Sequence, residues 1–321
     1  MILFADSGLG EHPLELQTSP LHETISIVIL TYNGEAYLKP LLEALIYQET
    51  DVPPEILVID SSSADSTLQI VRSYNLKTKV IDKNSFSHPG TRNLGVALTG
   101  GSHIVFITQD ALPTNPQWLK ELIRPFRIFP ILAASYSRQL PRPECNPLEA
   151  KDICGGAPCI DEVRVVDLSQ EWQRIDYAAN ITRYIRFSNV SACYPRKLLQ
   201  ENPFDETLKM VEDQEWTKRM IEKGYPVYYA SKSVVMHSHN FKIGEMYQRY
   251  FDYGSSFQKF LEHNPMRMKN LFLEVATDVL SLIPAQRSWL SKLKWMGKSF
   301  FVRFATNYGW RKGWNAGRFR S

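Results

Sequence analysis

Continuous apolar runs alternate with helically spaced apolar residues in the first part of the chain. The runs at 25–30 (ISIVIL), 55–60 (EILVID) and 103–108 (HIVFIT) are typical of parallel strands covered on both faces. A shorter strand is expected at 78–82 (TKVID), and Ser63 is expected to cap the helix before it. Strands and helices in turn predict an α/β fold with a mainly parallel sheet flanked by helices.

This alternation is lost after residue 131. We expect irregular structure at 131–143 (ILAASYSRQLPRP) and a strand at 184–194 (YIRFSNVSACY). A helix should end near Gly224 and lead into another strand. Apolar residues recur at helical spacing in the last part of the chain. The pattern therefore predicts three parts: an N-terminal extension (1–23), an α/β domain (24–240) and a helical C-terminal region (241–321).

Composition indicates a globular protein with a sizeable core. Of its 321 residues, 44% are hydrophobic and 22% charged, and four cysteines are too few for a disulfide framework. A reduced, cytoplasmic setting is expected, with neither a signal peptide nor a membrane-spanning run. Cys145, Cys154 and Cys159 could suggest zinc, but their spacing fits no tight knuckle and no histidine is near in sequence.

The charge is distributed unevenly along the chain. The net charge is +3, yet the segment after Asp278 has nine basic residues, no acidic residue and many aromatic ones. Basic and aromatic residues together favour contact with an anionic membrane surface. The alternatives are a helical tail that packs on its own domain or on a second copy of the chain in a homodimer. Nucleic acid is not an expected partner, because no groove-reading module is recognisable.

Polar side chains follow three of the expected strands. They are Thr31-Tyr32-Asn33, Asp60-Ser61-Ser62-Ser63 and Thr108-Gln109-Asp110. In open parallel sheets, ligands lie outside the carboxyl ends of the strands. These three strand ends therefore predict one common binding site.

Four blocks of sequence resemble inverting glycosyltransferases of the GT-A fold, in the family numbered two. The blocks are SIVILTYNG, EILVIDSSSADST, GTRNLGVALTGGSHIVFITQDALPTNPQWL and NPFDETLKMVEDQEWTKRMIEKGY, within residues 24–240. A narrower resemblance is to bacterial rhamnosyltransferases. It rests on FSHPGTRNLG, TQDALP, YSRQLPRPECNPLE, FSNV and VMHSHNF.

The resemblance implies a nucleotide-sugar donor, a divalent metal and a general base. Asp110 matches the last acid of the family's D-x-D motif and would ligate Mg²⁺ or Mn²⁺, while Thr108 replaces the first acid. One carboxylate, diphosphate oxygens and water can complete a magnesium shell. His237 is expected as a further ligand, with His239 as the alternative. Asp213 would take the proton from the acceptor hydroxyl.

Other positions are expected to bind the nucleotide. Asp60 would contact the base or ribose, with Thr31 and Ser62 nearby, and Gln109 lies next to the metal ligand. Arg92 begins a helix and could meet phosphate, or form a salt bridge that braces its loop. His88 could contact the donor sugar or cap a helix. Residues from the narrower signature could line the donor or acceptor pocket: Arg138, Gln139 and Arg142.

Three functions are compatible with these residues. The first is transfer of L-rhamnose from dTDP-L-rhamnose to a surface polysaccharide, such as a lipopolysaccharide, or to a lipid-linked oligosaccharide. It would occur at the inner face of the cell membrane, with the protein bound peripherally. The second keeps the chemistry but uses a UDP-hexose donor. The third is a non-catalytic, membrane-associated assembly partner, against which the carboxylates of Asp60, Asp110 and Asp213 argue.

Overall fold

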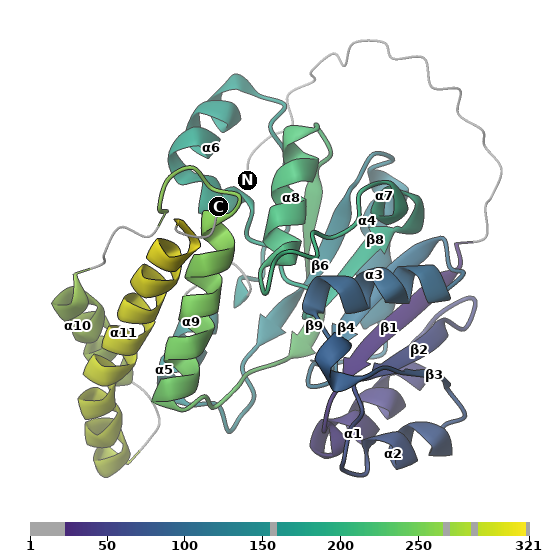
Figure 1. The fold of residues 1–321 in the computed structure, drawn as a ribbon. Helices are drawn as coiled ribbons and strands as arrows, with labels where there is room; N and C mark the ends of the chain where they lie inside the picture. The colour runs from purple at the N-terminus through teal and green to yellow at the C-terminus, as the bar shows by residue number, and fades with distance from the viewer. Residues whose placement is uncertain (1–22, 155–158, 266–269, 284–287, 319–321) are drawn as a thin grey trace.

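The structure is a computed structural model, and it describes residues 23–154, 159–265, 270–283 and 288–318 (Figure 1). The predicted N-terminal extension therefore lies almost wholly outside the described residues. The strands found in the described part are β1 (Ile25–Thr31), β2 (Glu55–Asp60), β3 (Lys77–Val80), β4 (His103–Thr108), β5 (Leu112–Pro113), β6 (Ala134–Leu140), β7 (Arg164–Val166), β8 (Ser191–Pro195) and β9 (Val227–Met236). Their order in one sheet is β3-β2-β1-β4-β8-β6-β9-β5, with β7 paired to β9.

Helices connect and cover these strands. Those of the α/β part are α1 (Glu35–Ile46), α2 (Thr67–Ser73), α3 (His88–Leu98), α4 (Trp118–Ile128), α5 (Pro147–Cys154), α6 (Glu171–Tyr184), α7 (Arg196–Glu201) and α8 (Glu212–Glu222), with a short 3₁₀ turn, η1 (Lys83–Ser85). The C-terminal helices are α9 (Ile243–Gln258), α10 (Leu271–Leu282) and α11 (Trp289–Arg318). The predicted helical character of the C-terminal region is thus confirmed in its described residues.

The first half of the sheet is parallel, as predicted, and the second half is mixed. β3, β2, β1 and β4 run parallel, whereas β8 is antiparallel to β4 and to β6. The expectation of irregular structure at 131–143 was wrong, because β6 lies there. Its buried Ser135 and Ser137 are satisfied by hydrogen bonds to Leu122 and Ser191, so the strand lacks an apolar pattern.

The strand expected at 184–194 was also too long. α6 extends to Tyr184 and the strand β8 begins only at Ser191. Between them, Asn189 lies outside the sheet, and its backbone N–H donates to Asp213, at the start of α8. The apolar residues of this connection, Ile185 and Phe187, are buried in the core without being part of a strand.

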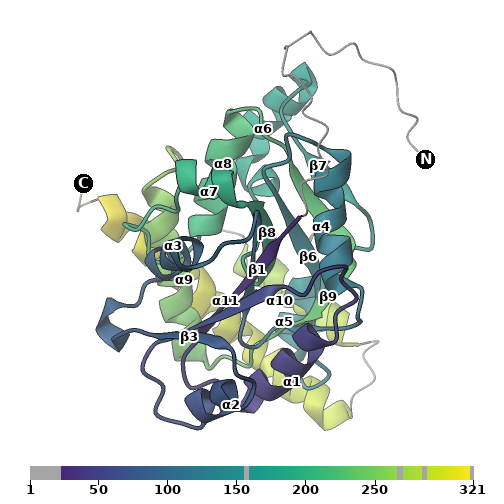
Figure 2. The ribbon, with the colours of Figure 1, turned by 90° about the vertical axis from the view of Figure 1, so that its right-hand side faces the viewer.

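Alternate residues of each central strand point to opposite faces of the sheet. Ile27 and Ile29 pack with α1, α2 and α4, whereas Val28 packs with α3 and α8. Figure 2 shows α4 on one side of the sheet and α3 and α8 on the other. Both faces are covered, which explains why the parallel strands read as continuous apolar runs.

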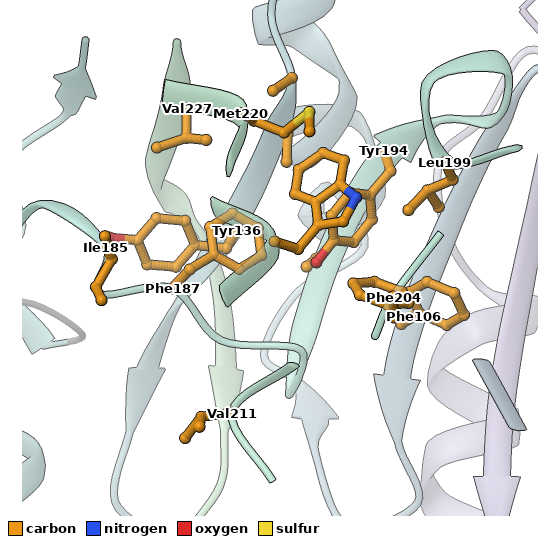
Figure 3. Packing of buried hydrophobic residues seen from close by; sticks show 14 of the residues in the cluster. Phe106, Tyr136, Ile185, Phe187, Tyr194, Leu199, Phe204, Val211, Met220 and Val227 are labelled. Carbon is orange, nitrogen blue, oxygen red and sulfur yellow. The ribbon is translucent and has the colours of Figure 1, made fainter. Parts of the chain in front are cut away.

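An aromatic cluster fixes α8 against the sheet. Phe106 of β4, Tyr194 of β8 and Phe204 lie together in the core (Figure 3). The buried Trp216 of α8 packs against Tyr194 and Phe204. The rings of Tyr194 and Trp216 meet edge to face at 5.0 Å, and the Trp216 indole N–H donates to Asn202 at 2.6 Å. Trp216 is thus a core residue, and its packing holds the first turn of α8 in place.

The C-terminal helices share the main hydrophobic core. α9 and α11 lie side by side (Figure 1), and Trp310 and Trp314 of α11 belong to the same cluster as Val28. A side chain at Gly313 would overlap the backbone of Phe251 in α9. The inner face of α11 therefore packs on its own chain. This packing was one of the alternatives expected for the basic C-terminal segment.

A buried ion cluster joins α10 and α11 to α5. Arg303 donates to Asp278 at 2.7 Å and to Asp152 at 2.8 Å, and Lys151 reaches Asp278 at 2.7 Å. Asp278 is fully buried, so its charge depends on these partners. Among the described helices, none has both the length and the apolar character needed to cross a bilayer.

Candidate active site

A pocket of about 410 Å³ lies at the carboxyl ends of β1 and β4, next to the start of α8. It gathers side chains that are far apart in the sequence, among them Asp110, His237 and Asp213. A larger hollow of about 980 Å³ lies by Glu23, Lys120 and Arg127, but it contains none of the predicted site residues. The chemistry predicted from the sequence therefore belongs to the smaller pocket.

Asp110, His237 and His239 form one cluster in this pocket. Asp110 follows β4, and the two histidines follow β9. Asp110 Oδ2 lies 3.6 Å from His237 Nε2 and 3.4 Å from His239 Nδ1. Within the described residues, this is the only group of three or more His, Cys, Asp or Glu side chains whose ligand atoms lie close enough to share a metal ion.

The orientation of His237 suits a metal ligand. Its Nδ1 lies 3.2 Å from the side-chain oxygen of Gln139, which accepts the Nδ1 proton and leaves Nε2 as a free lone pair. Burial lowers the pKa of His237 to about 4, so the ring is neutral at pH 7. An imidazole lone pair and a carboxylate oxygen then converge without a proton between them, an arrangement that a divalent cation completes.

Burial also lowers the pKa of His239. Two neutral imidazoles and one carboxylate are a donor set that divalent transition metals accept. Arg142 steadies the acid by donating to the backbone oxygen of Asp110 at 2.5 Å, and its guanidinium stacks on Tyr37. The residues present therefore fit the divalent metal that the sequence predicted.

Asp213 faces the same pocket from the first turn of α8. Its Oδ2 accepts the backbone N–H of Asn189 at 2.8 Å. Burial, and next the neighbouring charge of Glu212, raises the pKa of Asp213 to about 7. The preceding Val211 has a φ of 60°, a strained value for a β-branched residue, and this sharp turn directs α8 into the pocket.

Arg92 lines the pocket but is engaged by an acid. Its Nη1 lies 2.5 Å from Glu212 Oε1, and both side chains are buried. The salt bridge was one of the two alternatives expected for Arg92, and it joins α3 to α8. A contact of Arg92 with phosphate stays a prediction. His88, at the start of α3, also lines the pocket, while the helix is capped by Ser87.

The second strand end forms a closed turn. Asp60 is fully buried and accepts hydrogen bonds from Thr31 at 2.8 Å and from the Ser63 hydroxyl at 2.6 Å. Thr31 lines the pocket, whereas Asp60 and Ser62 are not among the residues that line it. Ser62 donates to the backbone of Ile81 instead.

The expectation that Ser63 caps the next helix was wrong, because Asp60 takes its hydroxyl and α2 begins only at Thr67. Gln109 lines the pocket and exchanges two hydrogen bonds with the backbone of Tyr32, at 2.9 and 3.1 Å. These bonds tie the turn after β1 to the end of β4.

The narrower signature lies behind the pocket wall. Gln139 contacts His237, Arg142 contacts Asp110, and Arg138 forms an ion pair with Asp161 at 3.0 Å. None of the three signature residues is among those lining the pocket. Gln139 and Arg142 position the cluster of Asp110 and the histidines, whereas Arg138 is engaged by Asp161.

Two pocket residues were not anticipated from the sequence. Arg249 and Tyr253 come from α9 and complete the wall of the pocket. Their helix shows only a general amphipathic pattern, so no motif distinguishes them. The thiols of Cys154 and Cys159 lie 2.8 Å apart, with no metal-binding group of three around them in the described residues.

Known proteins share sequence and architecture with this chain. The sequence profile of glycosyl transferase family 2 matches residues 26–153. The chain is 35% identical over 235 residues to the O-antigen chain rhamnosyltransferase RfbN of Salmonella typhimurium, covering 72% of this chain and 71% of that protein. It is 32% identical over 236 residues to the O-antigen chain rhamnosyltransferase WbaN of Salmonella anatum, with the same coverage.

A solved structure shares the fold. It is the mannosyltransferase PcManGT of Pyrobaculum calidifontis, in complex with GDP-Man and Mn²⁺, with a TM-score of 0.61 and 14% identity. The alignment covers 96% of this chain and 91% of the mannosyltransferase, which supports the predicted GT-A fold. From its sequence relatives and its architecture, the chain belongs to glycosyl transferase family 2.

Proposed function

We propose that this glycosyltransferase is inverting and metal-dependent, and that it moves L-rhamnose from dTDP-L-rhamnose to a hydroxyl of a surface polysaccharide or lipid-linked oligosaccharide. The observation that carries the proposal is one pocket that is lined by Asp110, two neutral histidines and Asp213. The similarity to two O-antigen rhamnosyltransferases supports the choice of sugar and acceptor class.

Asp213 is the proposed general base. It would accept the proton of the acceptor hydroxyl while that oxygen attacks the anomeric carbon from the side opposite the leaving nucleotide, which inverts the configuration. A pKa of about 7 matches this task, since the carboxylate is both ionised and basic near neutral pH. The N–H of Asn189 holds one carboxylate oxygen in position.

Asp110, His237 and His239 are the proposed ligands of Mg²⁺ or Mn²⁺. Such an ion, when bound, would neutralise the charge that develops on the departing diphosphate. Gln139 would keep the Nε2 lone pair of His237 directed toward it. Thr31 and Gln109 line the pocket and remain candidates for contacts with the nucleotide. Asp60 and Ser62 would influence nucleotide binding indirectly, through the turn that they form.

We also infer that α11 holds the protein at the inner face of the cell membrane. The outward face of α11 exposes an apolar stripe: Leu290, Leu293, Phe300, Phe301, Phe304 and Tyr308. The rings of Phe300, Phe304 and Tyr308 stack with their planes 12° apart, and the exposed Lys294, Lys298 and Lys312 lie on the same helix. Aromatic and basic residues on one helix face suit an anionic lipid surface.

A donor panel tests the proposed reaction. The purified chain is incubated with Mg²⁺, a lipid-linked or polysaccharide acceptor, and either dTDP-L-rhamnose or a UDP-hexose, and the released nucleoside diphosphate is measured. Turnover with dTDP-L-rhamnose alone supports the proposal. Turnover with the UDP-hexose alone would mean that the donor is a UDP-hexose and not dTDP-L-rhamnose. If nucleotide binding is intact but no donor supports transfer, a non-catalytic role would be favoured.

A further inference from the structure

The two arginines of the pocket differ in how they are paired. Arg92 is neutralised by Glu212 at 2.5 Å. Arg249 forms no ion pair with any acidic side chain in the described part of the chain. Arg249 is therefore a pocket arginine that is not engaged in a salt bridge among the described residues, although the half-buried Glu149 lies close enough to interact with its charge.

Two aromatic rings hold Arg249 in place. Its guanidinium lies 5.2 Å from the ring centre of Phe241 and 5.1 Å from that of Tyr253, one turn further along α9. These cation–π contacts restrain a flexible side chain and so reduce the entropy that it would lose on binding a ligand. The guanidinium is thus preorganised, while its N–H donors have no acidic acceptor within the described residues.

Arg249 belongs to the pocket that holds the groups proposed for metal binding and for proton transfer. It lines this pocket together with Asp110, His237 and Asp213.

We propose that Arg249 binds a diphosphate group through charge-assisted hydrogen bonds. This inference rests on the proposed function, and it assigns to α9 a part of the substrate site. A planar guanidinium matches two phosphate oxygens at once, which an ammonium group does not. Two substrates of the proposed reaction contain a diphosphate: the nucleotide donor and a lipid-linked acceptor.

Calorimetry with the whole chain tests the proposal and separates the two sources. Arg249→Met keeps the apolar stem and removes the charge, and Arg249→Lys keeps the charge without the fork. Each variant is titrated with dTDP, with farnesyl diphosphate as a lipid diphosphate, and with thymidine, which has no phosphate. Arg72→Met is the matched control, because Arg72 is an exposed arginine on α2 and is not among the residues lining the pocket.

We expect Arg249→Met to weaken the binding of one diphosphate at least tenfold and to leave thymidine unchanged. Arg249→Lys should fall between Arg249→Met and the natural chain. A loss confined to dTDP identifies the donor as the source, and a loss confined to farnesyl diphosphate identifies the acceptor. Binding of both diphosphates within twofold of the natural chain, or an equal loss for thymidine, would overturn the proposal.

The titrations also distinguish failure of the Arg249 proposal from failure of the proposed function. If the natural chain does not bind dTDP, the proposed reaction with dTDP-L-rhamnose itself is excluded. If it binds dTDP and Arg249→Met binds it equally well, the reaction stands and the role of Arg249 is withdrawn. Thermal unfolding of each variant confirms that it is folded before titration.

Discussion

At the scale of single residues, the central feature is a carboxyl group held partly out of water. Asp213 would be a weak base at the ordinary pKa of an aspartate, about 3.9. Burial and the charge of Glu212 raise its pKa to about 7, and the backbone N–H of Asn189 and the charge of Arg92 limit the rise. The strained Val211 and the N–H of Asn189 fix its position.

The pH dependence of transfer should reflect this raised pKa. A general base works only when ionised, so we expect kcat/KM to fall as the pH drops through about 7. The measurement is a pH profile of kcat/KM with dTDP-L-rhamnose saturating and the acceptor varied. An acid limb near pH 4, where an unperturbed aspartate titrates, would contradict the assignment of Asp213 as the base.

The same group should make the protein less stable at alkaline pH. Because the folded-state pKa of Asp213 is raised, its ionisation is disfavoured in the folded protein, and stability is lost between about pH 4 and about pH 7. Asp213→Asn removes this loss. We expect it to raise the free energy of unfolding at pH 8 by about 1–2 kcal/mol, allowing for solvent at the pocket, and to change it little at pH 4.

Urea denaturation of the natural chain and of Asp213→Asn at pH 4 and pH 8 measures the gain in the free energy of unfolding. An equal gain at the two pH values would refute the prediction. The same variant should lower transfer by a factor of about 10² or more, with donor binding retained. A loss below about tenfold would argue that another group accepts the proton.

At the scale of elements, α8 and α9 bring the site together. α8 is fixed by the aromatic packing of Trp216, and α9 is fixed by close contact with α11. Gly309 and Gly313 of α11 lie directly against backbone atoms of α9, so no side chain fits there. The helix that carries Arg249 is therefore positioned by two glycines that come much later in the chain, at 309 and 313.

Substitution of one of these glycines tests the contact. Gly313→Ala would overlap the backbone oxygen of Phe251, and we expect it to destabilise the protein by about 1–3 kcal/mol. Gly297→Ala in the same helix has open space around it and should be neutral, or stabilising by up to about 1 kcal/mol. Thermal unfolding distinguishes them, and equal melting temperatures for the two variants would contradict the close packing.

The sequence predicted an element correctly where all the side chains of that element lie in the same apolar environment. The strands β1, β2 and β4 are apolar on both faces and were therefore predicted with little ambiguity. β6 was hidden because the sheet accommodates Ser135 and Ser137 through side-chain hydrogen bonds, which no periodicity indicates. Arg249 was missed for a related reason, since its place in the pocket depends on how α9 packs on α11.

The predicted site was recovered to different extents. Asp110, His237 and Asp213 lie in one pocket, as the resemblance implied. The turn formed by Asp60 and Ser63 is closed on itself, so a motif that suggested nucleotide contacts also has a structural role. Hydrogen bonds between side chains that are distant in the sequence decide such cases, and a single sequence does not contain them.

At the scale of the whole molecule, the inner and outer faces of α11 differ. The inner face contributes Trp310 and Trp314 to the core, and the outer face exposes Phe301, which is 59% exposed. Binding of the outer face to a membrane would place the neighbouring α9, and with it Arg249, next to lipid-linked substrates. The segment beyond Asp278 has basic residues and no acidic ones, which favours an anionic surface. Arg287, Phe319 and Arg320 of this segment lie outside the described residues.

Vesicle binding tests this orientation. The double variant Phe300→Ser, Phe304→Ser should bind vesicles of anionic phospholipid at least tenfold more weakly than the natural chain, since it removes apolar surface that would enter the interface. Tyr47→Ser, at a position 77% exposed on the end of α1, is the control and should bind normally. Unchanged vesicle binding with a loss of self-association would instead assign the stripe to a homodimer.

The most direct test of the account is the binding of Mn²⁺ in the presence of dTDP, followed by electron paramagnetic resonance. The account predicts that the natural chain and Asp213→Asn bind the ion equally, whereas Asp110→Asn and His237→Ala bind it at least tenfold more weakly. Equal binding of Mn²⁺ by Asp110→Asn and the natural chain would contradict the proposed metal site and the mechanism built on it.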